Sequence, residues 1–361
     1  MDIVTHMVAG ALIGEAFFRP RLGRSAPIVG ALAAIVPDLD VIAGLISSDP
    51  LMAIKAHRSV THSLIFVPVA AMAVALVATL VTKRRALAGW YLSVAAAGLL
   101  AHLFLDLATN YGMVILWPWS DRRWALEWLG FLDPYLLAIM VTTLLLVWRR
   151  LRRGRADPAV TRCDVTQPEG SAGSAAAEPV DVHGGLPWQG IALRGLAMSA
   201  IYVLAMGAFH NVALDRLGQE LGHRGLSNQD IGRLSCAPVP LVPLAWNAFY
   251  TTDDGRQVHV GLIWILQRGT VPFDTVESDP TSPAIEAFRT SDQGRTWLGF
   301  ARFPVITERP GPDGATIVTG WDARFQTWVP AFGQLKYHGS AIRAEVGSDG
   351  IIRNVRLGGE E

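Results

Sequence analysis

Apolar positions form long runs over the first 213 residues and alternate with polar positions in short runs after about residue 225. The cleanest long run, residues 63–82, contains no charged residue. A helix needs about 20 apolar residues to cross the hydrocarbon core of a bilayer, and it satisfies its own backbone hydrogen bonds there. The pattern therefore predicts an all-α polytopic membrane bundle followed by a soluble, mostly-β domain.

The apolar runs predict five to six transmembrane helices. The predicted helices cover residues 2–18, 25–47, 63–82, 86–106, 131–148 and 188–213. The last is the weakest of them, because Arg194 interrupts it.

Basic residues gather after the first, third and fifth predicted helices. They are Arg19, Arg21 and Arg24, then Lys83, Arg84 and Arg85, then Arg149, Arg150, Arg152, Arg153 and Arg155. Cytoplasmic loops carry an excess of Lys and Arg. We therefore expect these clusters to be cytoplasmic and the N-terminus to be extracytoplasmic. The sixth helix then places the C-terminal domain on the extracytoplasmic side of the membrane.

Four parts of the chain follow from this pattern. Residues 1–150 are the membrane-embedded domain, and residues 188–213 are an additional transmembrane helix. Between them, residues 151–187 contain EGSAGSAAAEP and predict a flexible linker. Residues 214–361 contain short alternating runs such as VHVGLIWIL, separated by turn signals such as DDG and PDG, which predict the mostly-β domain.

Composition and charge restrict the classes of partner and of metal site that the chain can have. Hydrophobic residues make up 51% of the chain and charged residues only 17%, against about 25% charged in ordinary soluble domains. The formal net charge is zero, so nothing general indicates a nucleic-acid partner. The two cysteines, Cys163 and Cys236, give no disulfide framework and no thiolate zinc site. A metal would have to use His, Asp or Glu.

Ionisable residues recur in or beside the predicted helices, where they are costly and usually face a bundle interior. Because helix direction alternates along with their positions, we expect them to lie at one face of the membrane. They are His6, Asp38, Asp40, His57, His62, His102, Asp106 and Asp133. Such clustering at one face counts against an ion pathway through the bilayer.

Histidine and carboxylate together suit zinc and other first-row divalent metals. His102 and Asp106 share one helix face, because they are four positions apart. Asp38 is preferred to Asp40 as a ligand, and Asp133, before Pro134, is equally suited to capping a helix. The predicted metal ligands are therefore His6, Asp38, His57, His62, His102 and Asp106. They could hold one to three ions, with zinc the expected metal.

The ordered motifs carry a family resemblance. They are Thr5-His6, Pro37-Asp38-Leu39-Asp40, HRSVTHS over residues 57–63, and HLFLD over residues 102–106, followed by Thr109, Tyr111 and Gly112. Over about residues 1–150 this set resembles the inner-membrane metal-dependent hydrolases typified by YdjM. That family is distantly similar to zinc-dependent phospholipase C. The resemblance implies a metal-dependent hydrolase of the bacterial inner membrane and a phosphoester or lipid-type substrate.

We therefore expect an enzyme that hydrolyses a small-molecule or lipid substrate with metal-activated water. Arg58 and Asp40 are the expected catalytic residues. Arg58 could clamp an anionic oxygen or form a salt bridge with a motif carboxylate, and the sequence leaves both open. The alternatives are a non-enzymatic sensor or partner-binding protein with a structural metal site, and a transporter. Membrane lipids are expected partners, and the oligomeric state does not follow from the sequence.

Overall fold

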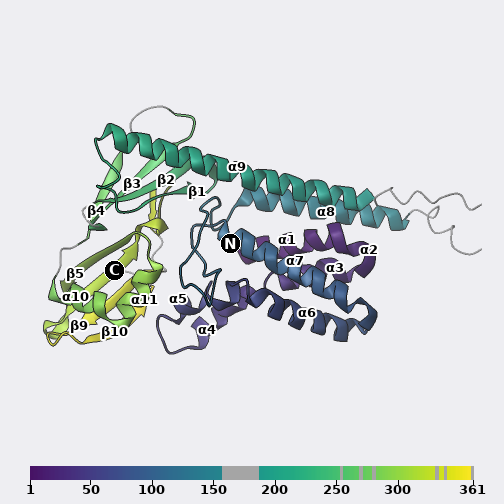
Figure 1. Cartoon of the computed structure of the whole chain (residues 1–361), viewed down its shortest axis with the longest axis horizontal. Helices are drawn as coiled ribbons and strands as arrows, with labels where there is room; N and C mark the ends of the chain where they lie inside the picture. Colours follow the sequence, from purple (N-terminus) through teal and green to yellow (C-terminus); the bar gives the residue numbers. More distant parts are fainter. Residues whose placement is uncertain are drawn as a thin grey trace, which may run out of the picture.

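The computed structural model describes residues 1–156, 187–252, 255–267, 271–278, 282–329, 333–336 and 340–358. The predicted flexible linker falls almost entirely on residues 157–186, outside the described residues, as does Cys163. The N-terminal half is helical and the C-terminal part carries the β-sheets (Figure 1). The predicted fold class, a helical membrane bundle followed by a mostly-β domain, is confirmed.

The membrane part contains three helices that are long and apolar enough to cross a bilayer. They cover Arg85–Leu107, Pro134–Arg153 and Trp188–His223. Two bent pairs of shorter helices qualify together, with bends of 41° and 79°, so the described residues offer up to five spans. Residues 2–18 form α1 (Ile3–Ile13) and a π-helical turn (Gly14–Phe18), which are too short to count as a span.

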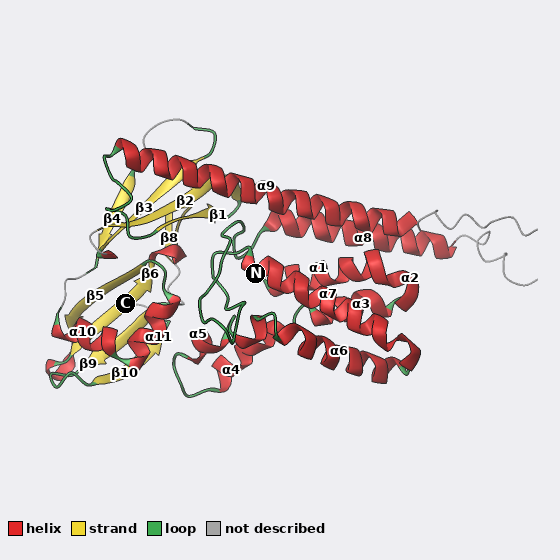
Figure 2. Cartoon of the chain, in the orientation of Figure 1, coloured by secondary structure: helices red, strands yellow, loops and turns green. Residues whose placement is uncertain are grey.

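The helices follow one another as α1, α2 (Arg19–Leu22), α3 (Ser25–Ala33), α4 (Val41–Ile46), α5 (Met52–Ala56), α6 (Phe66–Thr82), α7 (Ala88–Leu107), α8 (Pro134–Ala156) and α9 (Pro187–His223). The helices α1, α3 and α7 form the centre of the bundle, with α6 packed on α7 and with α8 and α9 side by side (Figure 2).

Glycines set the close approach of the three central helices. A Cβ atom on Gly10 of α1 would lie 2.2 Å from the carbonyl oxygen of Gly30 in α3, and one on Gly98 of α7 would lie 2.7 Å from the same oxygen. Small residues allow helix backbones to meet in membranes, where no hydrophobic effect drives the helices together. This packing fixes α3 against α7 and so places the ends of both helices beside each other.

Two helix breaks interrupt the bundle at the end that faces the β-sheets. Pro37–Asp40 forms a 3₁₀ turn between α3 and α4, and Val60–His62 forms another before α6. Proline at the start of the first turn lacks an N–H for the α-helical ladder, so the preceding helix ends there. The breaks contain the PDLD and HRSVTHS motifs. Their side chains therefore project from turns and not from regular helices.

The C-terminal part contains two four-stranded antiparallel sheets. The first has the order β1 (Leu234–Val239), β2 (Val242–Thr252), β3 (Gln257–Trp264), β4 (Phe273–Glu277), and the second has the order β10 (Ile352–Leu357), β9 (Ile342–Val346), β6 (Thr316–Asp322), β5 (Pro304–Pro310). β7 (Gln326–Val329) pairs with β8 (Gly333–Lys336). Two helices, α10 (Pro283–Thr290) and α11 (Asp292–Phe300), pack on the second sheet.

The helix α9 joins the two parts. It was predicted to end at residue 213 but continues to His223. Leu217 and Leu221 are buried in one core with Trp246 of β2 and Ile263 of β3. The added turns are amphipathic and pack on a sheet, so they lack the apolar run by which a membrane helix is recognised. We refer to residues 234–358 as the β domain.

Candidate metal centre

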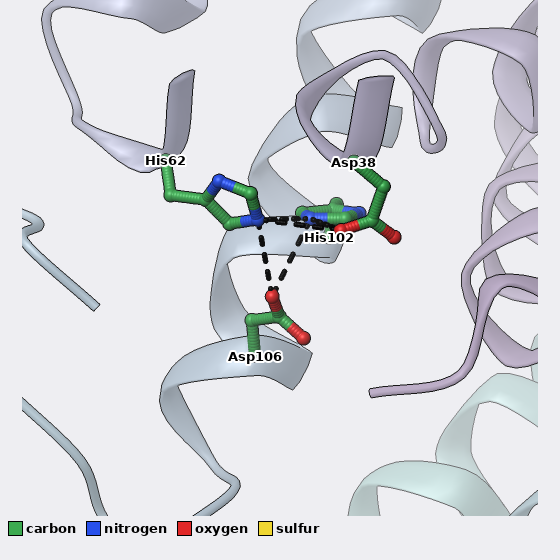
Figure 3. A group of neighbouring side chains, drawn as sticks. All are labelled: Asp38, His62, His102 and Asp106. Atoms are coloured by element: carbon green, nitrogen blue, oxygen red, sulfur yellow. Dashed lines mark hydrogen bonds and ion pairs between the residues drawn. The ribbon is translucent and has the colours of Figure 1, made fainter. Parts of the chain in front are cut away.

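Four of the predicted ligands meet at the end of the bundle that faces the β domain (Figure 3). Asp38 comes from the turn after α3, His62 from the turn before α6, and His102 and Asp106 from the last two turns of α7. One ligand atom of each lies within 4.8 Å of the others. We call these four residues the metal group.

The distances within the metal group match a metal site. The Nε2 atom of His62 lies 3.1 Å from Nε2 of His102, 3.2 Å from Oδ2 of Asp106 and 3.4 Å from Oδ1 of Asp38. From His102 Nε2, the same two oxygens are 3.6 and 3.7 Å away. Ligands about 2.0–2.1 Å from a tetrahedral zinc ion are roughly 3.3 Å apart. The spacing therefore fits a first-row divalent cation.

Hydrogen bonds at the other ring nitrogens orient both imidazoles. His102 donates from Nδ1 to the carbonyl oxygen of Ala34, at 2.6 Å. His62 presents Nδ1 to Oδ2 of Asp40, at 3.2 Å. An imidazole that donates from Nδ1 keeps a lone pair on Nε2. Two lone pairs and two carboxylate oxygens therefore converge on one point, which a divalent cation satisfies.

Asp40 and His57 lie beside the metal group but not within it. The carboxylate of Asp40 accepts hydrogen bonds from His57 Nδ1 at 2.8 Å, from the Arg58 backbone N–H at 3.1 Å and from Thr61 Oγ1 at 2.7 Å. The His57 side chain is 25% exposed, and its ring centre is 5.7 Å from that of His62. Asp40 therefore orients the histidine motif.

His6 packs against the metal group from α1. It is fully buried, and its ring stacks on that of His102 with the centres 3.9 Å apart. Its Nε2 lies 3.1 Å from Oδ1 of Asp106, the oxygen that does not face the other three ligands. The amino group of Met1 contacts the same oxygen. His6 thus contacts both His102 and Asp106 but is not one of the four residues of the metal group.

Arg58 makes the salt bridge that was one of its two predicted roles. It is 1% exposed, and Nη2 donates to Oδ1 of Asp106 at 2.8 Å while Nη1 donates to Thr109 Oγ1 at 2.8 Å. Its guanidinium carbon lies 4.7 Å from the ring centre of Tyr111. The backbone of Arg58 has φ 57°, a left-handed conformation that a non-glycine residue adopts at a cost. This turn directs the guanidinium inward, toward Asp106.

Asp133 has the capping role that the sequence left open. Its Oδ1 accepts the backbone N–H groups of Tyr135 and Leu136 in the first turn of α8, at 3.1 and 3.0 Å. Its carboxylate also accepts the hydroxyl of Tyr202 in α9, at 2.9 Å from Oδ2. Asp133 therefore fixes the α8–α9 pair and takes no part in the metal group.

Residues of the β domain also support the site, although the sequence motifs do not predict them. Arg324 donates from Nη1 to the carbonyl oxygens of Asn110 and Tyr111, at 2.8 and 3.2 Å. The Tyr111 ring lies 5.1 Å from that of Phe300. No local motif marks Arg324 or Phe300, which lie about 200 positions from the loop that they contact.

These features define a helical membrane protein with a group of four metal-type ligands at one end of its bundle. Residues 1–162 match the model of the YdjM inner membrane protein family, so this part of the chain is YdjM-like. The chain is similar to inner membrane protein YbcI of Escherichia coli (strain K12), with 29% identity over 170 residues that cover 40% of this chain and 90% of that protein. No solved structure gives a significant match.

Proposed function

We propose that this inner-membrane protein is a metal-dependent hydrolase that acts on a phosphoester or lipid-type substrate. The observation that supports the proposal most directly is the metal group, in which two imidazole nitrogens and two carboxylate oxygens converge. When bound, a divalent cation such as zinc supplies Lewis acidity to a phosphoryl or acyl oxygen and to a water molecule. The similarity of residues 1–162 to an inner-membrane family agrees with a membrane-bound enzyme.

The surrounding residues have separate tasks in this proposal. Asp40 holds the His62 ring so that Nε2 faces the other ligands. Arg58 binds one oxygen of Asp106 and leaves the other for the metal. Because guanidinium and carboxylate geometry are complementary, Arg58 acts by positioning Asp106. Asp38, with a side chain that is 14% exposed, is the one ligand of the four that solvent reaches.

The proposal is tested by metal analysis and by hydrolysis of bis(p-nitrophenyl) phosphate, a generic phosphodiester. We expect the purified protein to carry a divalent metal and to hydrolyse the ester, and we expect His102→Ala to lose both. Asp133→Asn is the matched control, because Asp133 caps α8 outside the metal group. Hydrolysis that survives His102→Ala, or protein without metal that keeps its activity, contradicts the proposal.

A structural metal site in a sensor or partner-binding protein is the second candidate. Four protein ligands close a zinc site, whereas catalytic zinc keeps a position open for water. Three of the four residues, His62, His102 and Asp106, are fully buried. Chelation separates the two candidates. If the ion is structural, its removal is expected to lower the unfolding temperature, and the protein has no hydrolytic activity to lose. If the ion is catalytic, its removal is expected to abolish hydrolysis.

We further propose that the metal group and the β domain lie on the extracytoplasmic side, as the distribution of basic residues indicates. Ser348 lies in an exposed turn of the β domain and is a suitable site for an engineered cysteine. In a background without Cys163 and Cys236, Ser348→Cys is expected to react with a membrane-impermeant maleimide in whole cells. Labelling only after cell lysis would reverse the proposed orientation.

A further inference from the structure

A cavity lies between the bundle and the β domain, next to the metal group. It has a volume of about 310 Å³ and a mostly apolar surface. Thr109, Tyr111 and Phe131 line it from the loop between α7 and α8, whereas Pro240 and Phe325 line it from the β domain. Neither half of the molecule forms this cavity alone. We call it the interdomain cavity.

The interdomain cavity shares two residues with the surroundings of the metal group. Arg58, which binds Asp106, also donates to Thr109 and lies over the ring of Tyr111. Tyr111 therefore separates the guanidinium of Arg58 from the cavity. One end of a molecule in the cavity would contact Thr109 and Tyr111, the side chains that Arg58 also contacts.

The charge of the cavity wall does not favour an anionic occupant. Arg324 is the cation in the lining, but its guanidinium is already engaged. It binds Asp322, and it donates to the carbonyl oxygens of Asn110 and Tyr111. Its Nε, Nη1 and Nη2 atoms all donate within the protein, so few N–H groups are left to bind an anionic ligand. The remaining lining favours hydrocarbon.

The cavity borders the position where the chain enters the bilayer. Phe131 is 61% exposed and Leu132 is 51% exposed, directly before α8 begins at Pro134. Leu241, beside the cavity residue Pro240, is 56% exposed, and its carbonyl oxygen accepts the hydroxyl of Tyr135 in the first turn of α8. An apolar surface thus runs from the membrane span to the edge of the cavity.

We propose that the interdomain cavity binds one acyl chain of a membrane lipid drawn from the leaflet on the β-domain side. Its volume is at the lower end of the range for small-molecule sites, about 300–1,000 Å³, which suits one chain and not a whole lipid. The inference rests on the proposed hydrolase function, because it assigns that enzyme a substrate whose head would reach the metal group while one chain lies in the cavity. The β domain then has a defined role, since it supplies one wall of the chain site.

The test uses the full-length protein in vesicles of phosphatidylethanolamine and phosphatidylglycerol that contain a phospholipid with a diazirine in one acyl chain. After irradiation, mass spectrometry locates the cross-linked peptides. We expect cross-links on the loop around Phe131 and on the segment around Pro240. A metal-group variant, His102→Ala, is expected to lose hydrolysis but to keep these cross-links, so the binding result does not depend on catalysis.

Two variants close the cavity by different means, and a third is the control. Gly130 lines the cavity, and a Cβ atom there would have its nearest neighbour at 3.5 Å, an ordinary contact, so Gly130→Trp is chosen to fill the cavity. Phe131→Glu places a charge at its exposed edge. The control, Gly89→Trp, introduces the same side chain at an open position at the other end of α7. We expect the first two variants to lower cavity cross-linking about tenfold, the effect of losing roughly 1.4 kcal/mol of binding, and Gly89→Trp to leave it unchanged.

Three outcomes overturn the inference while leaving the proposed hydrolase intact. The first is cross-linking confined to the exposed apolar side chains of α3 and α6, such as Ile28 and Leu76. The second is cavity cross-linking that neither Gly130→Trp nor Phe131→Glu lowers. The third is a dimer in detergent, broken by Phe131→Glu, which would show that a second copy of the chain covers this surface. Conversely, cavity cross-linking by a protein with no hydrolytic activity supports the chain site and removes the enzyme.

Discussion

Asp40 illustrates how a carboxylate outside a metal site can govern it. Its Oδ2 faces Nδ1 of His62, and the same carboxylate accepts hydrogen bonds from His57, the Arg58 backbone and Thr61. It therefore fixes both the tautomer of His62 and the path of the histidine motif. Partners of this kind typically change metal affinity by about 10–100-fold when they are replaced.

We predict that Asp40→Asn weakens metal binding by about 10–100-fold, because asparagine no longer offers a charged acceptor to His62 Nδ1. Competition with a chromophoric chelator measures the change. Asp133→Asn removes a carboxylate of similar burial that caps α8, so it is expected to leave metal affinity unchanged. Equal affinities for Asp40→Asn and the wild-type protein would contradict the role assigned to Asp40.

The sequence predicted the ligand types and their common location, but not the choice among them. Six residues were expected as ligands, and the structure brings Asp38, His62, His102 and Asp106 together. Of the other two, His6 lies on α1 and His57 follows α5 at a helix break. A regular helix has a fixed angular spacing, which correctly paired His102 with Asp106. A turn has none, so the direction of the His57 side chain depends on contacts made after folding.

At the scale of elements, the metal group depends on how closely α1, α3 and α7 approach. Asp38 follows α3, whereas His102 and Asp106 lie on α7. The carbonyl oxygen of Ala34, which receives the His102 N–H, also follows α3. Any separation of α3 from α7 therefore moves one ligand and the hydrogen-bond partner of another.

Gly98→Ala should separate α3 from α7, because its Cβ would lie 2.7 Å from the carbonyl oxygen of Gly30. Overpacking of this kind typically costs about 1–3 kcal/mol. We expect a lower unfolding temperature in detergent and less bound metal per chain. Gly89→Ala adds the same methyl group in open space and should change neither quantity. An unfolding temperature for Gly98→Ala equal to that of the wild-type protein would contradict the close approach of α3 and α7.

Long apolar runs and alternating runs allowed most elements to be predicted, because the solvent of each segment determines which residues it can expose. The helix α9 shows where this reasoning fails. Residues 214–223 are amphipathic and bury Leu217 and Leu221 against the β domain. The sequence also did not predict that residues 52–62 and α6 form one bent pair, since a 79° bend depends on the packing of the histidine motif.

At the scale of the whole molecule, the β domain is attached through charged contacts with the loop between α7 and α8. Glu127 of this loop is 6% exposed, binds the guanidinium of Arg302 and accepts the hydroxyl of Ser235 at 2.6 Å. Glu127 has φ 61°, a second non-glycine residue in the left-handed region. The loop therefore holds a costly conformation where it meets the β domain, which indicates that the contact stabilises it.

Burial raises the pKa of the Glu127 carboxyl above its ordinary value of 4.5, although Arg302 and Ser235 act in the opposite direction. The folded protein then binds this proton more tightly than the unfolded chain does. Its contribution to the free energy of unfolding falls as the pH rises from about 4.5 through the raised pKa. We expect Glu127→Gln to remove this part of the pH dependence, as measured by unfolding temperature against pH. Parallel profiles for the two proteins would contradict it.

The attachment itself can be measured with a double-mutant cycle on Glu127 and Arg302. Residues in direct contact usually show coupling energies of about 0.5–3 kcal/mol, and Glu127 is buried in this pair while Arg302 is 37% exposed. We therefore expect the coupling energy between Glu127→Ala and Arg302→Ala to be well above that of an exposed pair. Asp292 and Arg295 on α11 provide that reference, because their side chains are 91% and 66% exposed and exposed pairs contribute about 0–1 kcal/mol. If the two cycles gave the same coupling, the Glu127–Arg302 pair would add no more than an exposed pair, and other contacts, such as Tyr111 with Phe300, would hold the β domain to the bundle.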